Sequence, residues 1–242
     1  MGQFVNDTFT DADGTAITSH TGETGATWTA LTGSGHTPTI QSNALDPGTG
    51  ASVNGLWYAS GAPASADYTV TAEVTYNGGT DAIAGPGARM STSAQTGYWG
   101  FLFNGSSGSF DKFATYKYVS GTLTKIAGTG STPSISSGTV YTCTLDVSGS
   151  TIALRVQRSS DSNWLNSSGS WQAGQTNCLS TTDTSISAAG RPGFWLSRVS
   201  ASQSTIARLY ADEAGGGSTT APINTLVPHQ AQAFSSSTFR GV

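Results

Sequence analysis

The sequence TVYTCTLDVSGSTIALRVQ, residues 139–157, decides the fold. Apolar side chains occupy alternate positions on both sides of a short break at Ser148, Gly149 and Ser150. Strict alternation is the period of a β-strand with one buried face, and a short break centred on glycine lets the chain reverse. The stretch therefore predicts a β-hairpin. Because a lone hairpin is marginal in water, we expect it to belong to a larger antiparallel sheet packed on a second layer.

Further segments alternate in the same way. They are YTVTAEVTY at residues 68–76, the runs 83–90 and 98–103, a second hairpin at 112–126, and the closing runs 194–199 and 206–210. Windows of 11 residues show no convincing helical period. Strands of about five residues, repeated every 8 to 12 residues or so, indicate a sandwich or a barrel. We predict one all-β domain, an antiparallel two-sheet β-sandwich over residues 1–214.

The composition limits the classes of partner. Charged residues make up 10% of the 242 residues, against about 25% in an average soluble domain. A surface rich in Ser, Thr, Gly and Ala is more common in extracellular and particle-borne β proteins. The net charge of -4 and the absence of a Lys/Arg cluster argue against a nucleic-acid partner. Without an apolar run of about 18 residues, we expect no membrane partner, and the N-terminal residues show no secretory signal.

The C-terminal residues 215–242 differ from the rest of the chain. They open with a Gly/Ser linker, contain two prolines and hold too little apolar material for a core of their own. We expect an extended docking tail that binds another protein, or a second copy of this chain, through its apolar side chains. Those side chains are Ile223, Leu226, Val227, Phe234 and Phe239.

The two cysteines, Cys143 and Cys178, allow at most one disulfide. Cys143 falls on the inward phase of the hairpin, which suits a buried free thiol as well as a disulfide, and the free thiol is favoured. Neither cysteine has the neighbours of a zinc site.

Several segments together resemble a known family. They are DTFTDADGT with SHTGE, YTVTAEV, GPGARMSTSAQTGYWGFLF, TYKYVSGTLTKIA, the organising hairpin and ARLYADE. Their order resembles a concanavalin A-like lectin/glucanase domain, the jelly-roll sandwich shared by laminin-G-like modules and legume-lectin relatives. The segments WLNSSGSWQAG and TDTSISAAGRPG are similar to the form of this domain carried by bacteriophage structural proteins. The resemblance covers residues 4–214 and implies the fold rather than an activity, because this fold hosts enzymes, lectins and scaffolds.

Sugar binding requires exposed aromatic faces that stack on pyranose rings, with planar hydrogen-bonding groups beside them. The candidate residues are Trp57, Tyr98, Trp164 and Trp171, with Arg89 and Asn104 as polar partners. Trp99, Phe101 and Phe103 share one phase and are predicted in the core, which leaves Tyr98 on the other face. Trp164 and Trp171 flank the loop LNSSGS, where we expect them to form a rim. The alternative for each aromatic is packing against a sheet or under a loop.

A calcium site is a further prediction. Asp11, Ala12, Asp13 and Gly14 have the alternating carboxylates and terminal glycine of a calcium loop, although the closing glutamate is missing. The resemblance implies a calcium that ties the chain ends together, with Asp212 as the second contributor. The alternative is a turn rich in Asp, so calcium is an optional cofactor and none is required.

Catalysis is not expected. Glycoside hydrolases need two carboxyl groups about 5 to 10 Å apart across the sugar bond. The chain has three glutamates, Glu23, Glu73 and Glu213, and no two of them share a predicted strand. The three histidines lie in turn-like or tail segments, and no GxSxG elbow is present.

These features predict a non-enzymatic structural or adhesion protein of a virus particle. It would be a head-decoration, fibre or tail component of a bacteriophage, located in the virion and held by other virion proteins or by copies of itself. Its lectin-like sandwich would bind cell-surface polysaccharide. Phage particles leave by lysis, which reconciles an extracellular style of surface with the lack of a signal. The alternative is a carbohydrate-binding module of a secreted or surface protein of a bacterium, with an extracellular location, and the third reading is a glycoside hydrolase.

Overall fold

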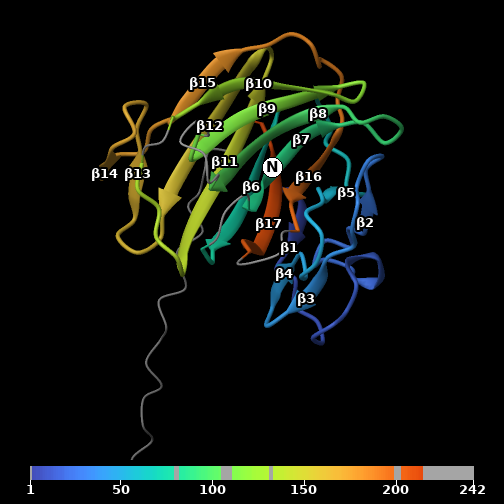
Figure 1. Ribbon diagram of the computed structural model, residues 1–242. Coiled ribbons are helices and arrows are strands. Elements are labelled where there is room, and N and C mark those ends of the chain that lie inside the picture. Colours follow the sequence, from blue (N-terminus) through green and yellow to red (C-terminus); the bar gives the residue numbers. More distant parts are fainter. Residues whose placement is uncertain (1, 79–81, 105–110, 131–132, 199–202, 215–242) are drawn as a thin grey trace, which may run out of the picture.

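The computed structural model shows two β-sheets packed face to face (Figure 1). It describes residues 2–78, 82–104, 111–130, 133–198 and 203–214. Every strand pair in these ranges is antiparallel, so the predicted two-sheet antiparallel sandwich is confirmed. The predicted tail at residues 215–242, with its docking residues Ile223, Leu226, Val227, Phe234 and Phe239, lies outside the described residues.

One sheet has ten strands. They are β1 (Gln3–Asp7), β3 (Thr39–Gln41), β4 (Ala44–Asp46), β6 (Tyr68–Tyr76), β11 (Thr139–Ser148), β12 (Thr151–Arg158), β13 (Asn163–Leu165), β14 (Trp171–Gln172), β15 (Leu179–Thr182) and β17 (Thr205–Glu213). Their order is β14-β13-β12-β11-β6-β17-β4-β3, with β1 paired to β17 and β15 paired to β12. The hairpin at residues 139–157 therefore lies inside this sheet rather than at its edge.

The other sheet has seven strands. They are β2 (Trp28–Ala30), β5 (Leu56–Ala59), β7 (Ala82–Met90), β8 (Gly97–Asn104), β9 (Phe113–Val119), β10 (Thr122–Gly128) and β16 (Arg191–Leu196), in the order β10-β9-β8-β7-β16-β5-β2. A single 3-10 turn, η1 (Ile17–Ser19), is the helical element of the described ranges. No helix among the described residues is long and apolar enough to cross a membrane.

The organising hairpin forms as predicted. β11 and β12 pair in continuous register from Tyr141 opposite Arg158 to Ser148 opposite Thr151. Gly149 has a φ of +54° at the tip, a conformation that glycine adopts without steric cost. The other side of β11 pairs with β6 along its length. Because both neighbours are in register, all three strands turn the same phase toward the second sheet.

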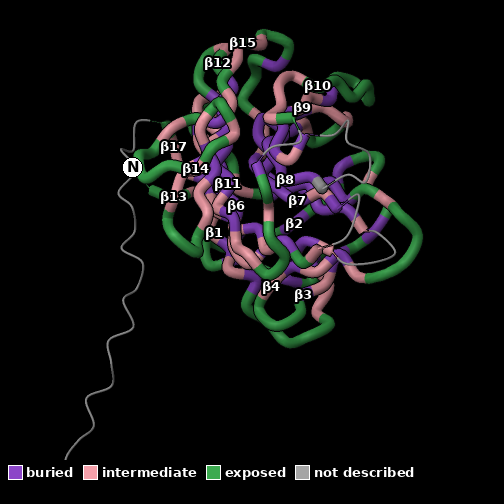
Figure 2. Tube along the Cα trace, turned by 60° about the vertical axis from the view of Figure 1, so that its left-hand side comes forward, coloured by how far each residue is buried: buried purple, intermediate pink, exposed green. Residues whose placement is uncertain are grey.

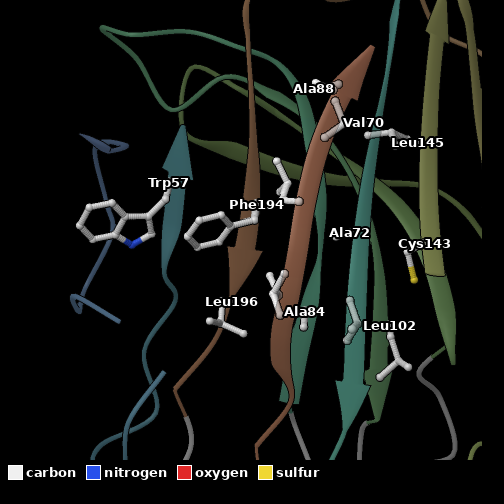
Figure 3. Close-up of a cluster of buried hydrophobic side chains, with 14 of the residues drawn as sticks. Trp57, Val70, Ala72, Ala84, Ala88, Leu102, Cys143, Leu145, Phe194 and Leu196 are labelled. Carbon is white, nitrogen blue, oxygen red and sulfur yellow. The ribbon is translucent and has the colours of Figure 1, made fainter. Parts of the chain in front are cut away.

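The core lies between the sheets. Figure 3 shows Val70, Ala72, Cys143 and Leu145 from the ten-stranded sheet near Ala84, Ala88, Leu102 and Phe194 from the seven-stranded sheet, and all are buried. Both cysteines are free and buried, so the favoured free thiol is confirmed. Burial raises the pKa of the Cys143 thiol and raises that of Cys178 to about 12, so both thiols are chemically inert at neutral pH.

A second apolar cluster covers the outer face of the seven-stranded sheet. It consists of Leu31, Leu56, Met90, Trp99, Phe101, Phe103, Ala114, Tyr118 and Trp195, and we call it the outer aromatic cluster. Three of its ring pairs meet edge to face, as between Trp99 and Trp195 at 6.1 Å and 80°. Figure 2 shows buried residues along the strands of both sheets and exposed residues mainly in the turns. These buried side chains pack on one another on the outer face of the sheet. They form a satellite core that is separate from the core between the sheets.

The faces of β8 are reversed relative to the prediction. Tyr98 and Leu102 point into the inter-sheet core, whereas Trp99, Phe101 and Phe103 belong to the outer aromatic cluster. Alternation separates two sets of side chains but does not say which set faces the partner sheet. Here both sets are apolar, so the sequence carries no contrast from which to choose.

Candidate functional site

The outer face of the ten-stranded sheet is polar. Leu145 and Leu154 point into the core, so the alternate positions Asp146, Arg155 and Gln157 point away from it. Thr69 on β6 lies opposite Asp146 on the same face. This face therefore presents hydroxyl, carboxylate, guanidinium and amide groups to solvent.

The edge of this sheet is split beside β12. β13 pairs with Gln157 and Arg158, and β15 pairs with residues 151–154 on the same side of β12 (Figure 1). Within the described residues no strand pairs with this side of Arg155, and the connection from β14 to β15 crosses there. Its end is held by the Cys178 amide, which donates to the Leu154 carbonyl at 2.9 Å.

This split leaves a shallow depression of about 640 Å³ that is largely open to solvent, which we call the edge pocket. It is lined by Asp146, Arg155, Gln175, Thr176 and Asn177. The side chains of Gln175 and Asn177 are exposed, and no described residue hydrogen-bonds their amide groups. Two planar amides are thus free to bind a ligand in the pocket.

The charged pair in the edge pocket is rigidly held. Arg155 Nη2 donates to Asp146 Oδ1 at 2.9 Å and lies 2.8 Å from Oδ2 in the same ion pair. The Thr69 hydroxyl also donates to Asp146 Oδ1, at 2.7 Å. Both charged side chains are partly buried, at 19% exposure for Arg155 and 29% for Asp146. Their orientation is therefore set before any ligand arrives.

Trp164 lies on the outer face of the sheet, on the strand β13 next to β12. Its neighbour Leu165 is buried in the core, so Trp164 points to the outer face, directly opposite Gln157. Arg155 lies two residues before Gln157 on β12, so Trp164 and Arg155 are diagonal neighbours across the two strands. Such neighbours are about 7 to 8 Å apart. Trp164 is only partly buried. An indole surface and polar groups therefore occur on the same face of this sheet.

Trp171 takes the opposite face, so the predicted rim of Trp164 and Trp171 is wrong. Trp171 pairs with Leu165 and packs against the core, where its ring stacks on Tyr141 at 5.8 Å. The guanidinium of Arg158 lies 4.5 Å from the ring centre. The two tryptophans were predicted to lie together because they flank one loop. Their positions on the strands instead direct the two side chains to opposite faces of the sheet.

Three other sugar-binding candidates are buried. Trp57 is 2% exposed in the inter-sheet core, and Figure 3 shows it beside Phe194. Tyr98 donates a hydrogen bond to Asp183 Oδ1 at 2.7 Å, and Arg89 donates to the carbonyls of Ala66 and Ile186. The contacts of Tyr98 and Arg89 brace loops, and the burial of all three residues contradicts the exposure that was predicted for them. Asn104 ends β8, and its side chain lies outside what the structure describes.

The predicted calcium ligands do not come together. Asp11 Oδ2 lies 3.3 Å from His20 Nδ1, and Asp13 accepts a hydrogen bond from the Ser42 amide at 2.7 Å. Asp212 is on β17, opposite Thr69 and Gln3. The described residues contain no group of three His, Cys, Asp or Glu arranged to hold a metal ion. These three carboxylates therefore do not fit a shared calcium site, and the turn, which was the alternative, is what Asp11 and Asp13 form.

Sequence reasoning missed the residues of the edge pocket. Asp146 and Arg155 occupy positions that alternate with the apolar residues of the hairpin, and the two-residue turn places them diagonally across β11 and β12. That register was a signal from which their pairing could have been inferred. Nothing in the sequence indicated that residues 175–177 return to the same edge.

No protein-family model matches the sequence, and no curated protein matches it either. Solved structures share the fold. The exoplasmic/lumenal domain of VIP36 bound to Ca²⁺ and Man2 is 11% identical with a TM-score of 0.54, covering 85% of this chain and 89% of that one. Its Ca²⁺/Man3GlcNAc-bound form is 10% identical with a TM-score of 0.55, covering 81% and 86%. The carbohydrate-binding module CBM66 from Bacillus subtilis is 13% identical with a TM-score of 0.45, covering 73% and 94%.

At these identities the likeness to VIP36 concerns the fold. It confirms the lectin-like jelly-roll sandwich that the sequence predicted. Fold and pocket together define a lectin-like β-sandwich with a polar pocket on the outer face of its larger sheet.

Proposed function

We propose that this chain is a non-enzymatic carbohydrate-binding protein whose glycan site is the edge pocket together with Trp164. The observation that carries the proposal is a partly exposed indole, Trp164, on the same sheet face as the Asp146–Arg155 pair, with two unpaired amides lining the pocket at that pair. A pyranose has an apolar face and a rim of hydroxyls, so it requires these two kinds of group side by side. The names of the VIP36 structures record bound mannose-containing ligands, which supports a glycan as the ligand class.

Binding is proposed rather than hydrolysis. Asp146 is the one carboxylate among the described residues that line the edge pocket, and it is held by Thr69 and Arg155. Hydrolysis needs a second carboxyl group about 5 to 10 Å away to share the work of acid and nucleophile or base. The proposed role of the pocket is recognition alone.

The test is a glycan screen with variants of the site. We expect Trp164→Ala to weaken binding at least about tenfold, which corresponds to about 1.4 kcal/mol of lost stacking. Asn177→Ala removes one free amide and should weaken binding to a smaller degree. Leu123→Ala is the control, because Leu123 is 42% exposed on the other sheet and lies outside the pocket. Equal binding by Trp164→Ala and the unaltered chain would place the glycan site elsewhere.

We also propose a setting for this activity, a bacteriophage particle on which the sandwich is displayed and held through residues 215–242. The similarity of WLNSSGSWQAG and TDTSISAAGRPG to phage structural proteins supports this setting. A secreted or surface-bound bacterial module with the same glycan site is the alternative. In the phage setting the tail binds a particle, whereas in the bacterial module it does not.

A further inference from the structure

We infer that the edge pocket selects neutral polysaccharides and rejects chains that carry carboxylates, because Asp146 and Arg155 together form a ready-made site for adjacent hydroxyl groups. This inference rests on the proposed function and names the ligand class of that same site.

The first step concerns the charge of the pocket. Arg155 is the one cation among its lining residues, and Asp146 already neutralises it. Gln175, Thr176 and Asn177 carry no charge. An acidic sugar would therefore bring a second carboxylate beside Asp146 without finding a free cation to pair with it. Two carboxylates placed side by side in this way repel each other strongly near a protein surface.

Neighbouring cations on the same sheet are engaged as well. Arg158 pairs with Asp161 and lies over the Trp171 ring. Arg208 donates to Asn6 Oδ1 and lies over the Tyr210 ring at 4.8 Å. Arg158 lies on the Trp171 side of the sheet, so Arg208 is the cation of these two on the outer face, and an acidic polymer lying there would have to displace its contacts with Asn6 and Tyr210 to gain an ion pair. The net charge of -4 adds a weaker, salt-screened repulsion.

The second step concerns hydrogen-bonding capacity. An ionised carboxylate offers about four acceptor positions, and Asp146 uses two of them, both on Oδ1, while Oδ2 lies 2.8 Å from Arg155 Nη2. Arg155 Nη1 donates to no described residue, so an acceptor and a donor lie next to each other. A sugar hydroxyl both donates and accepts, so two neighbouring hydroxyls match this arrangement. A carboxylate only accepts, and it can satisfy the donor but not the acceptor.

The test uses affinity electrophoresis of the full chain in native gels. The probes are dextran, xylan, mannan and mixed-linkage β-glucan, each compared with its carboxymethylated form. For any neutral polymer that retards the chain, we expect the carboxymethylated form to bind about tenfold more weakly at about 0.02 M salt, where screening is slight. Binding of the neutral form should change less than about twofold up to about 0.5 M salt. Equal or tighter binding of the carboxymethylated form would overturn the inference.

Asp146→Asn tests the assigned cause. The substitution keeps the size of the side chain, removes the negative charge and frees Arg155. The ratio of the affinities for the neutral and the carboxymethylated polymer should therefore fall close to one. Asp161→Asn is the matched control, because it removes the same charge from an Arg–Asp pair outside the pocket. A loss of discrimination of the same size in the control would overturn the assignment to Asp146.

Failure of this inference and failure of the proposed function give different results. If a polymer binds and Trp164→Ala weakens that binding, but the charge of the polymer is immaterial, only the ligand class is wrong. If none of the eight polymers retards the chain, the proposed glycan site fails and this inference fails with it. The comparison of polymers needs no variant, so it decides the ligand class even if Asp146→Asn does not fold.

Discussion

At the scale of single residues, side chains that the sequence marked for binding turn out to hold loops in place. The Tyr98 hydroxyl donates to Asp183 and accepts from the Ile186 amide, while Lys117 donates to Asp183 and Ser185. Burial of the Tyr98 hydroxyl and its bond to Asp183 raise the pKa of Tyr98 to about 12. This cluster fastens the segment before β16 to the seven-stranded sheet.

Asp183 makes this cluster sensitive to acid. Burial alone would raise the pKa of its carboxyl, but hydrogen bonds from Lys117, Tyr98 and Ser185 outweigh burial and lower it to about 2. A carboxyl whose folded pKa lies below its unfolded value of 3.8 stabilises the fold above that pH, and the contribution is lost as pH falls toward 2. We expect the free energy of unfolding to drop between about pH 4 and about pH 2.

Asp183→Asn should lower the free energy of unfolding at pH 7. It should also reduce the fall of that free energy between about pH 4 and about pH 2. Urea unfolding from about pH 7 to about pH 2 measures both effects, since the variant lacks the titrating group. A variant with the same pH profile as the unaltered chain would contradict the assigned role of Asp183.

At the scale of elements, the seven-stranded sheet depends on close contact between β7 and β8. A Cβ added at Gly85 would overlap the carbonyl oxygen of Gly100 and come within 2.6 Å of Phe101 Cα. The obstacle is backbone and cannot rotate away. The apolar packing on both faces of β8 relies on this spacing, because Tyr98 and Trp99 point to opposite sides.

Gly85→Ala should therefore destabilise the fold by about 1 to 3 kcal/mol, the usual cost of overpacking a closely packed interior. Thermal and urea unfolding measure the loss. Gly174→Ala is the matched control, since the nearest atom to its added Cβ would be Gln172 Nε2 at 4.0 Å and its stability should be unchanged. A Gly85→Ala chain as stable as the control would show that the two strands separate without cost.

At the scale of the whole molecule, the proposed glycan binding belongs to the sandwich and the proposed attachment belongs to the tail. The glycan site is built from β11, β12, β13 and the connection before β15, all within the described sandwich. Attachment to a particle is assigned to residues 215–242, and the predicted domain boundary at residue 214 remains a prediction. The two activities should therefore be separable.

Co-sedimentation with phage particles tests this division. We expect the full chain to pellet with the particles and a chain ending at Ala214 to stay in solution while keeping its glycan binding, because the pocket lies before the cut. If both chains pellet, the tail is not the anchor. If neither pellets, the virion setting fails and the bacterial module becomes the better description.

Alternation of apolar residues was sufficient to predict the hairpin at residues 139–157, its neighbour at 68–76 and the antiparallel sandwich, because a period of two is a local property of a half-buried strand. Trp164 was named a sugar-binding candidate from residue type alone, and its binding role remains a prediction. Local pattern failed for Trp57, Arg89, Tyr98 and Trp171, since burial depends on what the opposite sheet and the loops cover. The edge pocket was decided by tertiary structure only. It joins Asp146 and Arg155 to residues about 20 to 30 positions later through the split edge of β12, and no sequence period records a contact between segments so far apart.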